Sequence, residues 1–405
     1  MYPPVHLRFF CFPEHQILLI FKNAKYRFIV LYPYMNLLII GGGIAGTTCA
    51  EEFRKLSPDS KITIISDENH PLYSRVLLPH YLLGKIPRER VFLKTEEWYA
   101  EQNINLVYNE AVKLDATKKI ISAHDDKSFA YDKLLIAGGG KMNRLPISND
   151  KRAHHLQTVE DADKLLSAIN ERAGGKTEAH IFGGSFIAID FMKIFSHFNF
   201  EINIHIRGAK ILSRCFDDDG SAFLLNQLEK NGVQIRTNDP CDTISETADI
   251  VGIGIGLKSE FSWARDAGLK VESGILTNEF LETNALDIYA AGDCAEYYDI
   301  AVGRQVRAGN WTNAQTQGRL VAQNIFGNRI SYRNVNSYSA NVLGISIVAI
   351  GDATLNFVDD IVARQNNTGR TQYFLRNGAL VGAVLVNRND ERQKITDAIG
   401  KPFSL

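Results

Sequence analysis

Two glycine-rich turns have the residue types and the spacing that bind the phosphates of a dinucleotide. In the first turn, Gly41, Gly43 and Gly46 follow the apolar run NLLII and precede an amphipathic stretch. The first glycine permits a tight turn, the second lets the backbone approach a pyrophosphate, and the third lets helix and strand pack closely. The helix N-terminus then presents free amides and a positive dipole end to the phosphates. This turn therefore predicts a dinucleotide site.

Two acidic residues stand where ribose recognition needs them. The strand-like run KITIIS ends at Asp67 and Glu68, and Asp67 lies 21 residues after Gly46. An acid about 20 residues beyond the glycine turn binds the ribose hydroxyls. A glycine turn alone also occurs in other α/β domains, but a turn between two strands with this acid is specific for a dinucleotide.

The same layout returns in AHIFGGSFIAID, where Gly183, Ser185 and Ala188 hold the three positions. Alanine suits the third position, which serves packing, and Ser185 adds only a hydroxymethyl group that can hydrogen-bond a phosphate. The next run, INIHIR, ends in Arg207 and carries no acid, so an arginine is placed to pair with a 2′-phosphate. The turn predicts a working site that favours NADPH or discriminates weakly. The alternative is a relic that no longer binds a nucleotide.

The bulk composition excludes several classes of protein. The chain has 405 residues, which is too long for one ordinary core and predicts two or three domains. A net charge of -1 gives no electrostatic reason to expect nucleic acid or an anionic membrane as partner. The five cysteines lie far apart, so we expect a reducing, cytoplasmic setting with no disulfide and no metal site.

The first 34 residues differ from the rest of the chain. They are aromatic and apolar, but charged residues interrupt every run, and no stretch approaches the roughly 18 to 20 apolar residues of a membrane span. No small-residue cleavage site follows an apolar core, as a signal peptide requires. Because Met35 immediately precedes the first strand, we expect native translation to begin there, which makes residues 1–35 a leader of doubtful status.

The last third of the chain holds a further signal. In GILTNEFLETNALDIYAAGDCAEYYD we expect a short strand, a second strand ending at Gly292 and Asp293, and then the start of a helix. Asp293 at a strand end is placed to accept hydrogen bonds from a polyol such as ribityl, or, alternatively, to cap the helix. From about residue 331, short strands and a final helix capped by Asp390 predict a small α+β domain.

Together these segments resemble the two-dinucleotide flavoprotein reductases of the pyridine-nucleotide-disulfide oxidoreductase superfamily. The match is closest to ferredoxin and rubredoxin reductases and to the flavin portion of NAD(P)H-dependent nitrite reductase, which lack a redox disulfide. Four further segments carry the resemblance: HPLYSRVLLPHYLLGK, YDKLLIAGGGKMNRLPI, ADIVGIGIGLKSEF and GNWTNAQTQGRL. It implies the following site residues: Arg75 at the FAD phosphates, Ala137, Gly138 and Gly139 beside FAD, Gly254 and Asp190 near the nicotinamide, and Trp311 at the pyrimidine end of the flavin.

Departures from the family pattern bear on the chemistry. The first helix has only Cys49, and Val76 to Leu83 contain no cysteine, so we expect no thiol relay. Where ferredoxin-reductase relatives have a lysine near the flavin, this chain has His80. His80 is a candidate for steadying reduced-flavin charge or moving a proton, and a structural role is the alternative.

We therefore expect an α/β fold of two Rossmann-like dinucleotide-binding domains and a small C-terminal α+β domain. Residues 36–150 and 271–330 would bind FAD, residues 151–270 would bind NAD(P), and residues 331–405 would form an interface domain that supports a homodimer. The resemblance implies an FAD-dependent oxidoreductase that transfers hydride from NAD(P)H to FAD and passes electrons to an external acceptor protein or small molecule. The alternative is an FAD-binding sensor or scaffold with a non-functional NAD(P) site. We also expect Arg304 and Arg307 to form a charged surface where an acidic carrier docks.

Overall fold

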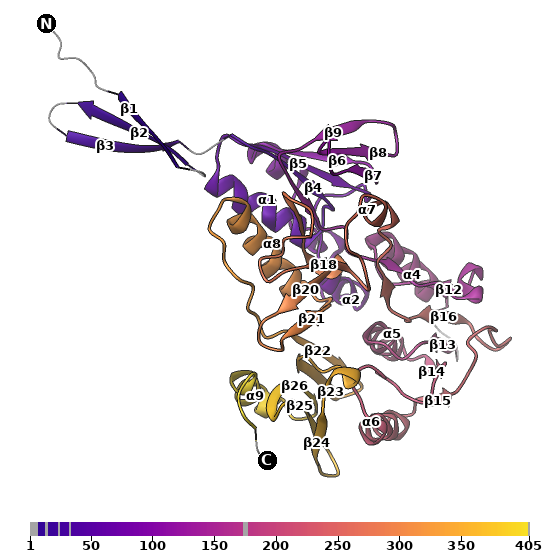
Figure 1. Cartoon of the computed structure of the whole chain (residues 1–405). Coiled ribbons are helices and arrows are strands. Elements are labelled where there is room, and N and C mark those ends of the chain that lie inside the picture. The colour runs from indigo at the N-terminus through magenta and orange to yellow at the C-terminus, as the bar shows by residue number, and fades with distance from the viewer. Residues whose placement is uncertain (1–6, 13–14, 23–24, 32–33, 173–176, 404–405) are drawn as a thin grey trace, which may run out of the picture.

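Three sheets organise the chain in this computed structural model, which describes residues 7–12, 15–22, 25–31, 34–172 and 177–403. Two of the sheets are parallel and the third is antiparallel (Figure 1). This is the expected α/β fold, with a smaller C-terminal unit after the two parallel ones. None of the described helices is long and apolar enough to cross a membrane.

The first unit is a five-stranded parallel sheet built on the first glycine turn. In spatial order its strands are β19 (Ile288–Ala290), β10 (Lys133–Ile136), β4 (Asn36–Ile40), β5 (Lys61–Ser66) and β6 (Ile104–Tyr108). Their runs are almost wholly apolar because helices cover parallel sheets and bury both faces. Helix α1 (Ile44–Leu56) packs against α8 (Trp311–Ile325), and the two cross closely where a Cβ on Gly318 would lie 2.2 Å from the Ala45 carbonyl oxygen.

The second unit repeats this arrangement. Its parallel strands, in spatial order, are β12 (Ala153–His154), β16 (Ile250–Ile253), β13 (Glu178–Phe182), β14 (Glu201–Ile206) and β15 (Gln234–Thr237). Its helices are α4 (Val159–Arg172), α5 (Phe186–His197) and α6 (Asp218–Lys230). The succession β13–α5–β14 has the same topology as β4–α1–β5, which is the duplication seen in the sequence.

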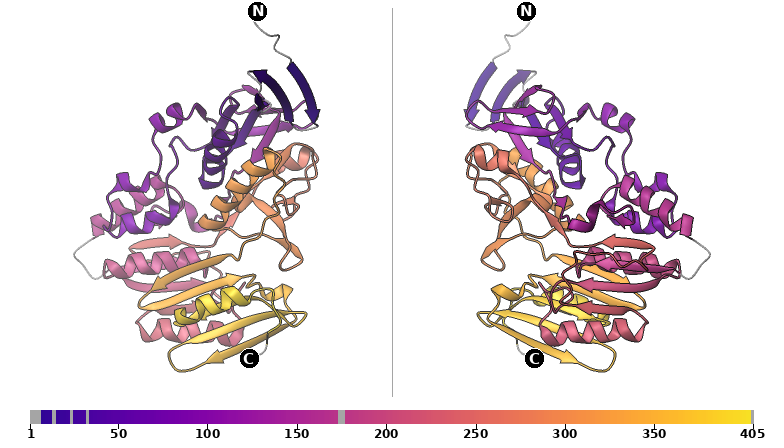
Figure 2. Two further views of the ribbon diagram at one scale, coloured as in Figure 1. Left: turned by 90° about the vertical axis from the view of Figure 1, so that its left-hand side faces the viewer. Right: turned by 90° about the vertical axis from the view of Figure 1, so that its right-hand side faces the viewer.

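The C-terminal unit is a five-stranded antiparallel sheet packed against the second unit. Its strands, in spatial order, are β22 (Ser337–Val342), β23 (Ile345–Gly351), β26 (Ala379–Val386), β25 (Arg370–Arg376) and β24 (Asp360–Gln365). Helix α9 (Arg392–Ala398) packs on β23 and β26, whereas α5 contacts β22 and α6 contacts β25. Figure 2 shows this unit beside the second one, with the first unit above both.

Smaller elements complete the chain. Among the described residues, the short helices are α2 (Leu78–Leu82), α3 (Glu96–Glu101) and α7 (Ser262–Asp266). One antiparallel sheet projects from the N-terminal end (Figure 1) and consists of β1 (Leu7–Phe12), β2 (His15–Lys22) and β3 (Lys25–Leu31). A second antiparallel sheet consists of β7 (Ala111–Asp115), β8 (Ile120–Ala123) and β9 (Ser128–Ala130). A two-stranded pair joins β11 (Lys141–Met142) to β17 (Leu257–Lys258).

Two expected helix starts are wrong. Asp293 lies in a single 3₁₀ turn, Gly292–Cys294, that leads into strand β20 (Ala295–Asp299) rather than into a helix. That strand pairs with β18 (Ile275–Thr277) and with β21 (Arg304–Val306), and these pairings replace the hydrogen bonds of a helix. The last helix begins after Glu391, and no side chain caps it, so Asp390 is not its cap.

Candidate functional site

The first glycine turn has the geometry that a bound pyrophosphate requires. Gly41 has a φ of +106°, and a Cβ there would lie 2.3 Å from the carbonyl oxygen of Ala137. A Cβ on Gly46 would lie 2.1 Å from the carbonyl oxygen of Gly41, so the helix could not approach the strand. Gly43 precedes α1 without a capping side-chain hydrogen bond, and a Cβ there would meet no atom within 4 Å. Open space and free amides therefore coincide at Gly43, which fits a phosphate.

The two acids after β5 have different surroundings. Glu68 forms an ion pair with Arg75 and accepts a hydrogen bond from the Tyr73 hydroxyl. Asp67 is exposed, and no side-chain hydrogen bond joins it to the other residues that the structure describes. Of the two acids, Asp67 is therefore the better placed to accept hydrogen bonds from ribose hydroxyls. The Arg75 guanidinium also donates to the Gln157 carbonyl oxygen at 2.5 Å, so its contact with FAD phosphates stays a prediction.

Asp293 lies beside this turn, at the carboxyl end of the sheet. A Cβ on the neighbouring Gly292 would lie 3.3 Å from the Ala45 Cβ in α1, so the two segments are in contact. The Asp293 carboxylate has no hydrogen-bond partner among the described residues, and burial raises its pKa. A half-buried carboxylate without a protein partner next to an open phosphate turn fits a polyol such as ribityl. The residues present therefore fit FAD.

Arg304 and Arg307 do not form the free basic surface that the sequence suggested. Arg307 donates to the carbonyl oxygens of Asp293 and Ser273, both at 2.8 Å, and to the Ser259 hydroxyl at 2.7 Å. Arg304 forms an ion pair with Asp352 in which the two side chains are 14% and 5% exposed. Both guanidinium groups thus bind other residues of the chain instead of remaining free for a carrier protein. Their partners lie far away in the sequence, so residue spacing does not indicate these contacts.

The second glycine turn is closely packed. Gly183 has a φ of +122°, and a Cβ there would lie 2.2 Å from the carbonyl oxygen of Gly254. Ala188 is fully buried, and a Cβ on Gly254 would lie 2.5 Å from its backbone nitrogen. Alanine at the third position of the turn is thus accommodated by a glycine on the facing strand end.

The sequence predicts that the Ser185 hydroxyl can hydrogen-bond a phosphate, but in the structure this hydroxyl is already engaged. It donates to the Gly254 carbonyl oxygen at 2.7 Å and accepts from the Ile187 amide at 3.2 Å, which caps α5. Serine side chains favour this capping position because they satisfy an otherwise unpaired helix amide. Any phosphate bound here must be held by other groups of the turn.

Asp190 lies on α5, which packs against β22 of the C-terminal unit. Burial raises the pKa of its carboxyl to about 6. Burial also raises the pKa of Tyr338 in β22, and the charge of Asp190 adds to this. The Tyr338 ring is 4.3 Å from that of Phe186, the first residue of α5. Tyr338 is a candidate site residue that the sequence analysis missed, because only the packing of two distant segments brings it to Asp190.

The other predicted site residues occupy several places. Ala137, Gly138 and Gly139 follow β10, beside the first turn, and Trp311 is the half-buried first residue of α8. His80 lies on α2, and its buried Nδ1 has no hydrogen-bond partner among the described residues. The structure thus brings the first turn, residues 137–139 and Asp293 together at the carboxyl ends of the strands of the first sheet. At the same end of the second sheet it brings together Gly183, Ser185, Ala188 and Gly254.

Comparison with known proteins decides the family. The sequence model of the family described as pyridine nucleotide-disulphide oxidoreductase matches residues 35–318. The chain belongs to this family. Its cofactors are FAD and NAD(P)H, and it is an NAD(P)H-dependent flavoprotein oxidoreductase.

Individual relatives agree with this assignment. The chain is 29% identical to an NADH-rubredoxin oxidoreductase of Clostridium acetobutylicum, over 79% of this chain and 83% of that protein. It is 26% identical to a nitrite reductase [NAD(P)H] of Bacillus subtilis, over 90% of this chain but only 47% of that protein. Among solved structures, the covalent putidaredoxin reductase–putidaredoxin complex superposes with a TM-score of 0.81 at 26% identity, covering 90% of this chain and 93% of that one.

Proposed function

We propose that this oxidoreductase passes electrons from NAD(P)H, through FAD, to a separate electron-carrier protein of the rubredoxin or ferredoxin type. The relatives whose names include rubredoxin, putidaredoxin and nitrite reductase support this acceptor class. When bound, FAD supplies the redox chemistry, because it takes up two electrons together and can release them singly. The observation that carries the proposal is the pair of glycine turns at the edges of two parallel sheets, one open at Gly43 and one closely packed at Gly254.

The protein's part in this scheme is positioning. Gly41, Gly43 and Gly46 with residues 137–139 would hold the FAD phosphates, and Asp67 the ribose. Asp293 would hold the ribityl chain, and Trp311 would lie at the pyrimidine end of the flavin.

Gly183, Ala188 and Gly254 would hold the coenzyme on the second unit, with Asp190 near the nicotinamide. Residues 36–150 with 271–330 would then form the FAD domain, 151–270 the NAD(P) domain and 331–405 the interface domain.

The state of the cysteines supports direct transfer from the flavin rather than a thiol relay. Cys49, Cys215, Cys241 and Cys294 are all buried and free. Burial raises the pKa of Cys215 and of Cys294 to about 12, which keeps these thiols protonated and unreactive at neutral pH. From the wide spacing of the cysteines along the chain, we propose a reducing compartment, the cytoplasm.

Stopped-flow absorbance of the FAD-loaded protein tests the proposal. Mixing with NADPH or NADH under anaerobic conditions should bleach the flavin, and added rubredoxin or ferredoxin should restore its colour. Bleaching without reoxidation by either carrier would reject the acceptor class. No bleaching by either coenzyme at roughly millimolar levels would reject the working site and favour the FAD-binding sensor or scaffold.

We further propose that the second unit prefers NADPH because of Arg207. Arg207 follows β14, is exposed, and has no hydrogen bond or ion pair with any residue that the structure describes. A free guanidinium at this strand end is available to a 2′-phosphate. The substitution Arg207→Asp should lower kcat/KM for NADPH by about tenfold or more and should leave that for NADH equal or higher.

A matched control for this substitution is Arg319→Asp, which changes an exposed arginine on α8. That variant should keep the native ratio of NADPH to NADH activity. An unchanged ratio in Arg207→Asp would exclude Arg207 from coenzyme selection without affecting the proposed electron transfer.

A further inference from the structure

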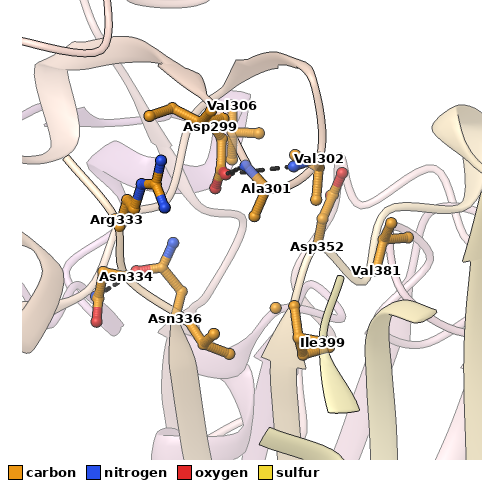
Figure 3. A pocket seen from close by; sticks show the side chains of 13 residues that line it. Asp299, Ala301, Val302, Val306, Arg333, Asn334, Asn336, Asp352, Val381 and Ile399 are labelled. Atoms are coloured by element: carbon orange, nitrogen blue, oxygen red, sulfur yellow. Dashed lines mark hydrogen bonds between the residues drawn. The ribbon is translucent and has the colours of Figure 1, made fainter. Parts of the chain in front are cut away.

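A cavity of about 380 Å³ lies between the first unit and the C-terminal unit. Its wall combines the turn between β20 and β21, the segment before β22, and the ends of β23, β26 and α9 (Figure 3). A volume of this size is typical of sites that hold a small molecule.

The cavity is separate from the cofactor site. Val306 lines it, whereas the next residue, Arg307, donates its hydrogen bonds to Asp293 and Ser273. Successive side chains of an extended segment point to opposite faces, so the two residues face different spaces. Asp352 also lines the cavity, but its carboxylate is already paired with Arg304.

Two charged side chains of opposite sign line this cavity, and neither forms an ion pair with another described residue. Asp299 is half-buried, and among the described residues its carboxylate accepts hydrogen bonds only from the main-chain amides of Ala301 at 2.8 Å and Val302 at 3.4 Å. Burial raises the pKa of this carboxyl, so a cationic partner would stabilise its charged form. Arg333 is exposed at the rim, and no hydrogen bond or ion pair joins its guanidinium to any other described residue. Figure 3 shows its side chain directed into the open space.

The remaining wall supplies shape and apolar contact. The Asn336 amide donates to the Tyr297 hydroxyl at 2.7 Å, which fixes that side chain at the edge of the cavity. Val306, Val381 and Ile399 provide an apolar surface. This lining is complementary to a ligand that carries one anionic group, one cationic donor and an apolar body.

We infer that this cavity binds a free apolar L-amino acid. Its carboxylate would pair with Arg333, since a guanidinium binds carboxylates with two parallel hydrogen bonds. Its ammonium would donate to Asp299, and its side chain would pack on Val306, Val381 and Ile399. A bound ligand would bridge the first unit and the C-terminal unit, which makes the site one for an effector rather than for the electron acceptor.

Isothermal titration calorimetry on the full chain, with no coenzyme present, tests this inference. L-Leucine and L-phenylalanine should each give saturable binding. L-Leucinamide lacks the carboxylate and 4-methylpentanoate lacks the ammonium, so both should bind at least about tenfold more weakly. Glycine, which lacks the apolar body, should also bind more weakly. No saturable heat with either amino acid up to roughly 10 mM would overturn the inference, as would equal binding of 4-methylpentanoate.

Two substitutions locate the binding in this cavity. Arg333→Gln and Asp299→Asn should each weaken L-leucine binding by about tenfold or more, and thermal unfolding of each variant checks that it remains folded. Arg319→Gln, at an exposed arginine far along α8, should bind as the native chain does. Native affinity in both Arg333→Gln and Asp299→Asn would place the binding elsewhere and overturn the assignment. Because these measurements use no NAD(P)H, their failure would leave the proposed electron transfer untouched.

Discussion

Gly41 and Gly43 lie two residues apart in one turn but have different surroundings. At Gly41 the backbone has a positive φ, and an added methyl group would collide with a backbone oxygen. At Gly43 the methyl group would enter open space. The backbone at Gly43, with a φ of -71° and a ψ of -172°, is one that alanine adopts readily. The fold therefore requires the first glycine, whereas the second would be required only by the proposed contact with an FAD phosphate.

Substitutions at these two positions should separate folding from binding. Gly43→Ala should lower the stability of the FAD-free chain by less than about 1 kcal/mol. The same substitution should weaken FAD binding by about tenfold or more, because the methyl group would block a phosphate contact. Gly41→Ala should lower stability by about 2 kcal/mol or more because the clash involves backbone atoms. Urea unfolding of the apoprotein and fluorescence titration with FAD measure the two effects. Normal FAD affinity in Gly43→Ala would contradict the assignment of this turn.

Asp190 should make stability depend on pH. Its folded pKa of about 6 lies above the ordinary value of 3.8, so the folded state binds the proton more tightly than the unfolded state. The stabilisation is therefore complete below pH 3.8 and is lost as the pH rises through about 6. At pH 8, Asp190→Asn should be more stable than the native chain by about 1–2 kcal/mol, and the difference should disappear near pH 4. Parallel curves of unfolding free energy against pH would contradict this burial.

At the scale of elements, an ion pair joins strand β21 to the end of β23. Arg304 and Asp352 are among the least exposed ion-paired side chains of the described residues, and Arg304 also lies 3.8 Å from the centre of the Phe357 ring. Removing one member of a buried pair leaves the other charge without a partner in a poorly hydrated place. This contact therefore connects the first unit to the C-terminal unit.

Breaking the pair should destabilise the whole chain. Arg304→Met should lower the free energy of unfolding by about 3 kcal/mol, measured by urea denaturation. Lys118→Met is the matched control, because Lys118 pairs with Asp115 where their side chains are 74% and 38% exposed. The control should change stability by less than about 0.5 kcal/mol. Equal effects of the two substitutions would show that burial does not strengthen the Arg304 contact.

At the scale of the whole molecule, one apolar core runs through all three units. The same cluster contains Leu37 of β4, Phe191 of α5 and Val342 of β22. This largest cluster crosses the unit boundaries, although smaller separate clusters exist, such as the one around Val348 and Leu380 in the C-terminal unit. Ligand binding to one unit should therefore be felt by the others.

We expect FAD to stabilise the chain as a single body. Differential scanning calorimetry should show one main unfolding transition. FAD at roughly 100 times its Kd should move this whole transition to higher temperature, because it adds about 2.7 kcal/mol to the free energy of unfolding. Two transitions, of which only one moves with FAD, would show that the units unfold separately. The cofactor-free chain provides the reference scan.

The sequence alone determined the glycine turns, the buried strands and the family, because these depend on short-range patterns, whereas the helix starts expected at Asp293 and Asp390 were wrong. Gly41, Gly43 and Gly46 mark a strand–turn–helix whatever surrounds them, and buried parallel strands appear as continuous apolar runs such as NLLII. The tertiary structure alone decided which polar groups are free. Arg304, Arg307 and the Ser185 hydroxyl find partners far away or across the turn. Among the described residues, Asp299 accepts only from amides of its own turn, and Arg333 has no side-chain partner. The physical reason is that hydrogen bonding and burial are set by contacts between distant segments, which residue spacing does not encode.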